Sequence, residues 1–359
     1  MGATHNITAF GTPEANAAAI SFIAKWQSVQ ASELSAAQSF TNDLCDLLGQ
    51  PHPHPTPEQS YMFERPITFQ HGDGTTSAGR VDCYKRGHFV LEAKKLKAAS
   101  HTKGFDDGLL RARSQAEAYA RALPASESRP PFVLVVDVGT VIEVYAEFSR
   151  SGGTYTPFPD PRSHRIALAE LAQPEVRARL HAIWTAPHTL DPARRSAQVT
   201  REVAALLARL AKTLEQRHPP EQVATFLTRC LFSMFAEDVG LLPPLVWSAS
   251  SAAVLGEAQD PGNGEPPGYP GAFSALLKVH RNRPDVLQRM LRILWADMDM
   301  GGFSAALASD VLRFNGKLFK GAGADGYSLL LQPDETDLLI QAAQANWREV
   351  EPAIFGTLL

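Results

Sequence analysis

The chain has 359 residues, which exceeds one typical domain and is long enough for two modest hydrophobic cores. Its net charge of −4 excludes a protein that attracts nucleic acid by overall charge, and its three widely spaced cysteines argue against a disulfide framework or a zinc site. No apolar run approaches the length of a membrane span, and residues 1–30 lack a signal-peptide pattern. We therefore expect a cytoplasmic protein without membrane contact.

The first half of the chain alternates between helical and extended patterns. Residues 16–50 have helical spacing of apolar residues, and a stiff proline-rich connector follows at 51–57. Residues 61–70 predict a strand, which Gly72-Asp73-Gly74 turns into the next one. The remaining predicted elements are a hairpin over 79–94, a helix over 106–123, a hairpin over 131–148 and a helix over 166–184. This order predicts an α/β fold with a mixed sheet flanked by helices.

The second half reads as all-α. From residue 193 onward no convincing strand is found, and the proline-containing stretch 187–192 marks the boundary. We place the domains at 1–188 and 189–359. Helices are predicted over 199–217, 220–237, 285–296 and 334–350.

The hairpin over 79–94 is the most informative stretch of the chain. A turn at Arg86-Gly87-His88 places Asp82 on one strand and Glu92 and Lys94 on its neighbour. Glu92 and Lys94 are two residues apart, so they point to the same face. Two close carboxylates repel each other unless a divalent cation lies between them. Mg²⁺, with Mn²⁺ as a substitute, is held by one or two carboxylates plus substrate phosphates, so the pattern predicts hydrolysis of a phosphodiester.

A solvated group of surface charges is the competing interpretation. Against it, Phe89-Val90-Leu91 is continuously apolar, as in a strand buried on both faces, and it leads directly into Glu92. A basic cluster surrounds the two carboxylates and is expected to contact a DNA backbone, although a solvated basic loop is the alternative. The candidate DNA-contacting residues are Arg80, Lys85, Arg86, Lys95, Lys97 and Lys103.

These motifs resemble the PD-(D/E)XK nuclease domain of MmeI-like type IIL (type IIG) restriction–modification enzymes, which fuse endonuclease, helical spacer, adenine methyltransferase and target-recognition domains. Residues 314–319 resemble the Phe-Asn-Gly-Gly-Leu-Phe motif of the family's helical spacer, with Lys317 in place of the second glycine. The resembling segments are 63–65, 71–74, 79–82 and 89–94 in the first half, and 226–232, 235–243, 314–319 and 352–359 in the second.

The resemblance implies roles for individual residues. The family's catalytic Asp, Glu and Lys fall on Asp82, Glu92 and Lys94, and the carbonyl of Ala93 joins the two carboxylates as a metal ligand. In one branch of these nucleases a Gln-x-x-x-Tyr pair follows the hairpin. It falls here on Gln115, implied to act near the metal as a catalytic residue, and on Tyr119, implied to contact the DNA backbone. Asp43 is a candidate to reach the same site, with a surface or capping role as the alternative.

The function implied is that of a Mg²⁺-dependent DNA endonuclease in a fused phage-defence enzyme, acting on double-stranded DNA. The sequence has no methyltransferase glycine loop and no Asn/Asp-Pro-Pro-Tyr/Phe motif, so S-adenosylmethionine and the methyltransferase and target-recognition domains are expected outside it, in cis or on a separate chain. Alone, the chain is expected to cut poorly or not at all. The alternative is a non-cutting DNA- or partner-binding module of a phage-defence adenine methyltransferase.

Overall fold

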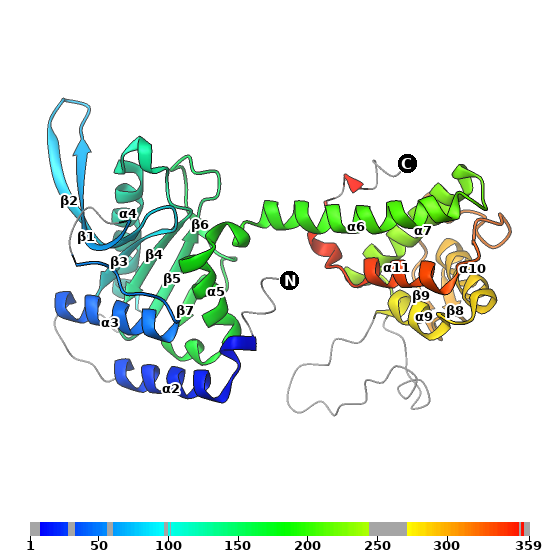
Figure 1. Cartoon of the computed structure of the whole chain (residues 1–359), viewed down its shortest axis with the longest axis horizontal. Coiled ribbons are helices and arrows are strands. Elements are labelled where there is room, and N and C mark those ends of the chain that lie inside the picture. Colours follow the sequence, from blue (N-terminus) through cyan, green and yellow to red (C-terminus); the bar gives the residue numbers. More distant parts are fainter. Residues whose placement is uncertain are drawn as a thin grey trace. The chain divides into compact units, whose positions relative to one another are not determined.

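The computed structural model describes residues 8–27, 33–55, 60–96, 100, 102–243, 271–351 and 353–354. The chain divides into two compact units, Met1–Asp191 and Pro192–Leu359 (Figure 1). The predicted boundary after residue 188 falls within the short 3₁₀ turn η3, Pro187–Leu190, which precedes the division.

The first unit is built on a seven-stranded mixed sheet. Its strands follow the path β1 (Tyr61–Gln70), β2 (Thr76–Lys85), β3 (Phe89–Lys94), β4 (Phe132–Asp137), β5 (Val141–Ala146) and β6 (Thr156–Pro157), while β7 (Arg165–Ala167) also pairs with β5. Strands β1, β2 and β3 form an antiparallel meander, whereas β3 and β4 are parallel. Helix α4 (Lys103–Ala122) makes the crossover that the parallel pair requires.

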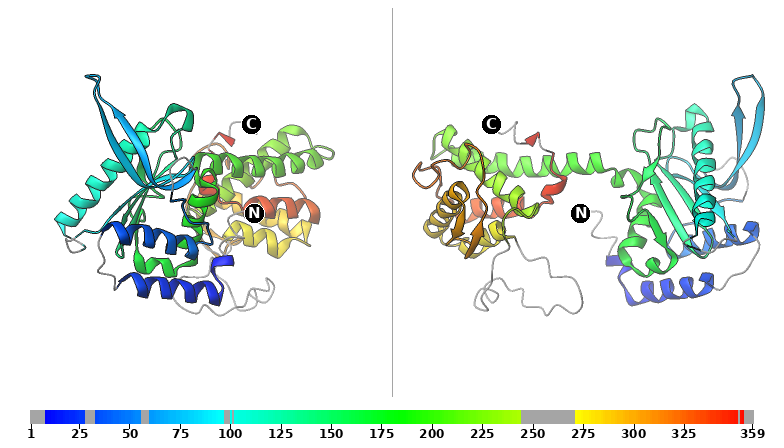
Figure 2. Two further views of the ribbon diagram at one scale, coloured as in Figure 1. Left: turned by 60° about the vertical axis from the view of Figure 1, so that its left-hand side comes forward. Right: turned by 180° about the vertical axis from the view of Figure 1, so that it is seen from behind.

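Helices cover both faces of the sheet (Figure 2). Helix α4 packs on one face, where Leu109 and Ala116 meet Val90 and Val133 in one core cluster. Helices α2 (Pro13–Gln27), α3 (Glu33–Leu47) and α5 (Pro174–Thr185) supply the core of the other face. Strands β4 and β5 are buried throughout. The predicted flanked sheet is therefore confirmed.

The outer part of the β1–β2 hairpin extends beyond the rest of the sheet (Figures 1 and 2). Its outermost pairs are Thr68 with Ala78, and Gln70 with Thr76. Residues 70–78 are all exposed, whereas the inner half of the hairpin contributes Met62, Phe63 and Cys83 to the buried interior. One hairpin thus combines a core segment with a solvated one.

Most predicted elements lie close to the observed ones. β1 has the predicted bounds, and α4 begins three residues earlier than predicted. The helix predicted over 166–184 was wrong in its first part, because those residues form β7, the 3₁₀ turn η2 (Leu168–Ala172) and then α5. Pro174 explains the late helix start, since proline fits the first turn of a helix but not its interior.

The second unit is helical. Its helices are α6 (Pro192–Leu214), α7 (Pro220–Asp238), α9 (Ala272–His280), α10 (Pro284–Met300) and α11 (Pro333–Ala343), followed by the 3₁₀ turn η4 (Trp347–Glu349). The expectation of no strands was wrong in one place, where β8 (Gly302–Ser304) and β9 (Ser309–Val311) form a small hairpin. Three-residue strands are too short to show an alternating pattern. No helix in the described part of the chain has the length and apolar composition needed to cross a membrane.

Segments 226–232 and 314–319, two of those that carry the resemblance, meet in the core of this unit. Arg229 of α7 donates from Nε to the carbonyl oxygen of Leu318 at 2.9 Å. The ring of Phe232, also on α7, packs edge-on against Phe314 and Phe319, with centroids 5.7 Å apart in each pair. The resemblance in this half therefore falls on residues that hold the fold together.

Candidate active site

Asp82 of β2 is bonded directly to β3, the strand that carries Glu92 and Lys94. Strand β2 pairs with β3 in a register that sets Cys83 opposite Leu91. Next to this pair, Asp82 Oδ2 accepts a hydrogen bond of 2.7 Å from the main-chain N–H of Ala93. The Asp82 carboxylate therefore lies beside the peptide bond between Glu92 and Ala93.

Glu92 and Lys94 form an ion pair along β3. Lys94 Nζ lies 2.8 Å from Glu92 Oε1. Glu92 is buried, with 1% of its surface exposed, whereas the Lys94 side chain is 26% exposed. The two side chains thus lie on one face, as the sequence predicts, and Lys94 connects a buried carboxylate with the solvent side of the site. A buried carboxylate needs such partners to remain charged.

Two further buried carboxylates lie on neighbouring strands, and sequence reasoning missed both. Asp137 of β4 is the register partner of Lys94, and its Oδ1 accepts the Leu96 N–H at 2.7 Å. Glu143 of β5 lies opposite Val135, which in turn lies opposite Glu92. A parallel pairing across a long crossover leaves no local sequence signal, so these neighbours become visible only in the folded sheet.

The buried Glu143 carboxylate is held by hydrogen bonds from two neighbouring side chains. Its carboxylate accepts hydrogen bonds from Tyr145 Oη at 2.8 Å and Arg165 Nε at 2.7 Å. Arg165 also reaches Asp106, in the first turn of α4, at 2.9 Å. Burial and the neighbouring Glu143 carboxylate raise the pKa of Tyr145 above its ordinary value. Glu143 therefore joins β5, β7 and α4.

The predicted DNA-contacting residues fall into two groups. Lys85 donates from Nζ to the carbonyl oxygen of Trp184 at 2.7 Å, and burial lowers the pKa of its ammonium. Lys95 Nζ likewise binds the carbonyl oxygen of Val138 at 2.7 Å. Both ammonium groups therefore have structural partners within the unit.

The second group is solvent-facing. Arg80 and Lys103 are exposed, and exposed Arg86 makes a 3.4 Å contact with the carbonyl oxygen of Ser126. Lys97 lies outside the described residues. Contact of any of these residues with DNA stays a prediction.

Gln115 and Tyr119 of α4 interact with each other. Gln115 Nε2 donates to Tyr119 Oη at 2.9 Å, and the Tyr119 ring stacks on Phe69 of β1 with centroids 5.7 Å apart. Both residues therefore lie at the root of the projecting part of the hairpin. Their implied roles at the metal and on DNA stay predictions.

Asp43 joins two helices at the surface of the unit. Its Oδ2 accepts the Trp26 Nε1–H at 2.8 Å and lies 2.5 Å from Lys25 Nζ. These contacts tie α3 to α2 and correspond to the alternative surface role.

The donor set suits a metal that takes few protein ligands. In the described part of the chain, no group of three or more histidine, cysteine, aspartate or glutamate side chains is arranged to hold a metal ion. Asp82 and Glu92 offer two carboxylates on adjacent strands, with the peptide of Ala93 between them. Mg²⁺ keeps several waters and is held by one or two carboxylates plus substrate phosphates, so these residues fit it.

The site thus consists of a carboxylate on one strand of a mixed sheet and a Glu-x-Lys pair on the next strand. The family described as "MmeI, N-terminal domain" matches residues 15–217, which is more than half of the chain. The chain therefore belongs to this family and is related to restriction–modification enzymes. The match runs through α6 and ends between α6 and α7. No curated protein and no solved structure matches the chain.

Proposed function

We propose that this chain contains a Mg²⁺-dependent DNA endonuclease module of a restriction–modification enzyme, with its catalytic centre at Asp82, Glu92 and Lys94. The observation that supports the proposal most is the joint placement of these residues. Asp82 is bonded to the Ala93 peptide at 2.7 Å, and Lys94 Nζ lies 2.8 Å from Glu92 Oε1. Family membership supports the restriction–modification context.

Each residue has a chemical task in this proposal. Asp82, Glu92 and the Ala93 carbonyl would hold the cation, which when bound lowers the pKa of a water and neutralises phosphate charge. Lys94 would orient or deprotonate the attacking water, or stabilise the charge that develops on the phosphorane. Its ion pair with Glu92 holds the ammonium in place for any of these tasks.

The same contacts are compatible with a non-cutting module. The Asp82–Ala93 hydrogen bond and the Lys94–Glu92 ion pair would also stabilise a sheet that only binds DNA or a partner protein. The two functions differ in phosphodiester cleavage. Only a nuclease breaks a phosphodiester, and in this proposal cleavage requires Lys94.

The test is cleavage of a supercoiled plasmid by the purified chain with Mg²⁺ or Mn²⁺. We expect weak nicking without sequence preference, which Lys94→Ala and Lys94→Arg both reduce about 10²–10⁴-fold, because arginine cannot act as a base. Lys320→Ala, an exposed lysine of the second unit, is the matched control and should cut like the wild type.

Two results would contradict the proposal. Plasmid binding without nicking in either metal would favour the non-cutting module. Full activity of Lys94→Ala would move the catalytic centre elsewhere, whereas full activity of Lys94→Arg alone would restrict Lys94 to the role of a fixed charge.

A further inference from the structure

The projecting part of the β1–β2 hairpin has a surface suited to a polar partner. We define the arm as residues 68–80, which comprise the outer ends of β1 and β2 and the turn between them (Figures 1 and 2). None of the large hydrophobic side chains that are exposed in the described part of the chain belongs to the arm. Its exposed side chains include the hydrogen-bonding groups of Thr68, Gln70, His71, Thr75, Thr76 and Ser77.

The arm also carries little negative charge toward a partner. Its one carboxylate, Asp73, accepts hydrogen bonds at Oδ1 from the Thr75 N–H at 2.9 Å and the Thr75 hydroxyl at 2.7 Å. These bonds lower the pKa of Asp73 and keep the carboxylate at the tip, while Arg80 adds a positive charge near the root. An apolar protein partner would require exposed hydrophobic area, which the arm lacks.

Helix α4 fixes the direction of the arm. The Phe69 ring stacks on Tyr119 at 5.7 Å, and Tyr119 is held in turn by Gln115. On the other strand, Gly79 approaches so closely that a Cβ there would lie 2.7 Å from Tyr119 Cε1. This packing gives the Gln115–Tyr119 pair a positioning role for the arm.

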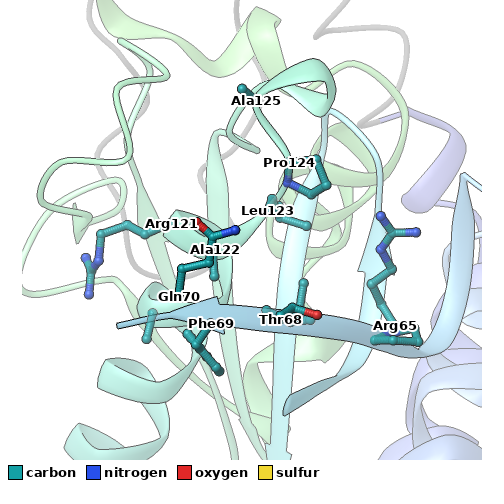
Figure 3. Close-up of a pocket in the computed structure, with 12 residues that line it drawn as sticks. Arg65, Thr68, Phe69, Gln70, Arg121, Ala122, Leu123, Pro124 and Ala125 are labelled. Carbon is teal, nitrogen blue, oxygen red and sulfur yellow. The ribbon is translucent and has the colours of Figure 1, made fainter. Parts of the chain in front are cut away.

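A cleft of about 780 Å³ opens beside the root of the arm, between Arg65–Gln70 of β1 and the end of α4 (Figure 3). Arg65 and Arg121 flank it on two sides. Arg65 is paired with Glu127, but the Arg121 side chain is 47% exposed and makes a 3.4 Å contact with Glu117. The cleft thus presents a solvent-accessible guanidinium at an exposed sheet edge, which suits a phosphate group.

We propose that the arm and this cleft form the surface that holds duplex DNA beside the catalytic centre. A two-stranded ribbon fits the major groove, where hydroxyl and amide groups meet base edges and backbone. Thr76 lies six residues from Asp82 on the same strand, about 20 Å at ~3.3 Å per residue, or roughly six base-pair steps. The arm therefore contacts the duplex whose phosphate lies at Asp82, and Arg121 contacts its backbone. This inference rests on the proposed nuclease function.

Binding of a fluorescent duplex in EDTA tests the arm separately from cutting. Thr76→Glu/Ser77→Glu adds two negative charges to the arm and should weaken binding on the order of tenfold, because the added carboxylates repel the phosphate backbone. The matched control, Ala17→Glu/Ser21→Glu, adds the same charge to exposed positions of α2 and should have a much smaller effect. Unchanged thermal melting of both variants confirms that they fold.

Salt dependence separates the cleft from the arm. Arg121→Ala should lower the slope of log affinity against log salt by about one, because one phosphate contact is lost. Thr76→Ala/Ser77→Ala should weaken binding with the slope unchanged, since no cation is removed.

The possible failures are distinguishable. Equal affinity of the arm variant and the α2 control, together with plasmid nicking by both, would overturn the arm proposal and leave the nuclease intact. If the wild type neither binds the duplex nor nicks the plasmid, the proposed function is overturned, and this inference with it. An unchanged salt slope for Arg121→Ala would remove the cleft from the interface.

Discussion

Buried charge serves different purposes in the second unit and at the candidate site. In the second unit, Arg229 of α7 is 2% exposed and pairs with Asp325, which is 96 residues away along the chain. Arg217 and Glu335 are paired in the same manner at 2.5 Å. At the candidate site, by contrast, the ion pair joins Glu92 and Lys94, two residues of a single strand.

The difference indicates which buried charges stabilise the fold and which are available for chemistry. An ion pair between two segments that are distant in the chain holds them together, and we call such a pair a staple. Removal of one partner leaves an uncompensated buried charge. The Glu92–Lys94 ion pair lies within β3, so the pair itself joins no segments that are distant in the chain. Glu143, also in the first unit, is of the stapling kind because Arg165 links it to Asp106 of α4.

The largest effect should follow the loss of a staple. Arg229→Met removes the ion pair with Asp325 and the hydrogen bond to the Leu318 carbonyl, and we expect the second unit to lose about 3–5 kcal/mol of unfolding free energy. Urea unfolding with thiol labelling measures the unfolding free energy of each unit separately. Burial raises the pKa of Cys83 in the first unit and Cys230 in the second, so each thiol reacts when its own unit opens.

The control for this prediction is an exposed pair. Arg195→Met breaks a 3.0 Å contact with Glu349 in which the arginine side chain is 58% exposed, and it should cost at most about 1 kcal/mol. Adding Asp325→Leu to Arg229→Met should restore part of the loss, because a hydrophobic replacement leaves no unpaired charge. Equal losses for Arg229→Met and Arg195→Met would show that the buried pair is not a staple.

The second prediction concerns the candidate site. At a Mn²⁺ concentration 100 times its Kd, the wild type should gain about 2.7 kcal/mol of stability by mass action. Asp82→Asn keeps an acceptor for the Ala93 N–H but lacks the charge, so the gain should disappear while metal-free stability changes little. Differential scanning calorimetry with and without Mn²⁺ measures both quantities. Asp310→Asn, at an exposed position of β9, should retain the gain, and a gain retained by Asp82→Asn would place the metal elsewhere.

The comparison also shows which parts of the molecule the sequence predicts. Local patterns predicted β1 with its observed bounds and the hairpin carrying Asp82, Glu92 and Lys94, because alternation and turn residues act within a few positions. The adjacency of Lys94 to Asp137 could not be predicted, since it depends on a parallel pairing across α4. Sequence distance likewise concealed the contact of Lys85 with Trp184, 99 residues away.

Composition was a poor guide to accessibility within the predicted basic cluster. Lys85 and Lys95 were grouped with Arg80 because the three residues lie close together in the sequence. In the structure, main-chain carbonyls bind the two ammonium groups, whereas Arg80 is exposed on the arm. Packing between distant segments determines which group a lysine or arginine side chain contacts. A count of charges along the sequence does not contain that information.

A smaller effect is expected at the root of the arm, where packing replaces charge as the link between helix and sheet. Gly79→Ala places a Cβ within 2.7 Å of Tyr119 and 3.0 Å of Phe69, and we expect a loss of about 1–3 kcal/mol from overpacking. Ala78→Gly, its exposed neighbour, is the control for backbone effects. Urea unfolding followed through Cys83 measures the difference. No loss in Gly79→Ala would mean that the stacked rings move freely and do not fix the arm.

The smallest effect should come from a staple that faces solvent. Arg281 and Asp337 join α9 and α11 in the second unit, but their side chains are 41% and 38% exposed. The hydrogen bond from Arg281 lowers the pKa of Asp337 below its ordinary value. A carboxylate with a depressed folded-state pKa stabilises the fold above its unfolded pKa of about 3.9, and this contribution is lost as pH falls through the folded value.

Asp337→Asn should therefore lower the melting temperature at pH 7 by about 2 °C or less, and the difference from the wild type should vanish in acid. High salt should also reduce the difference, because the Debye length falls to about 3 Å at 1 M. Melting curves at pH 7 and at a pH low enough to protonate Asp337 in the folded state, each in low and high salt, give the four values needed. A large loss at pH 7 that persists in 1 M salt would mean that solvent exposure does not separate weak staples from strong ones, and that the comparison with Arg229 must rest on geometry alone.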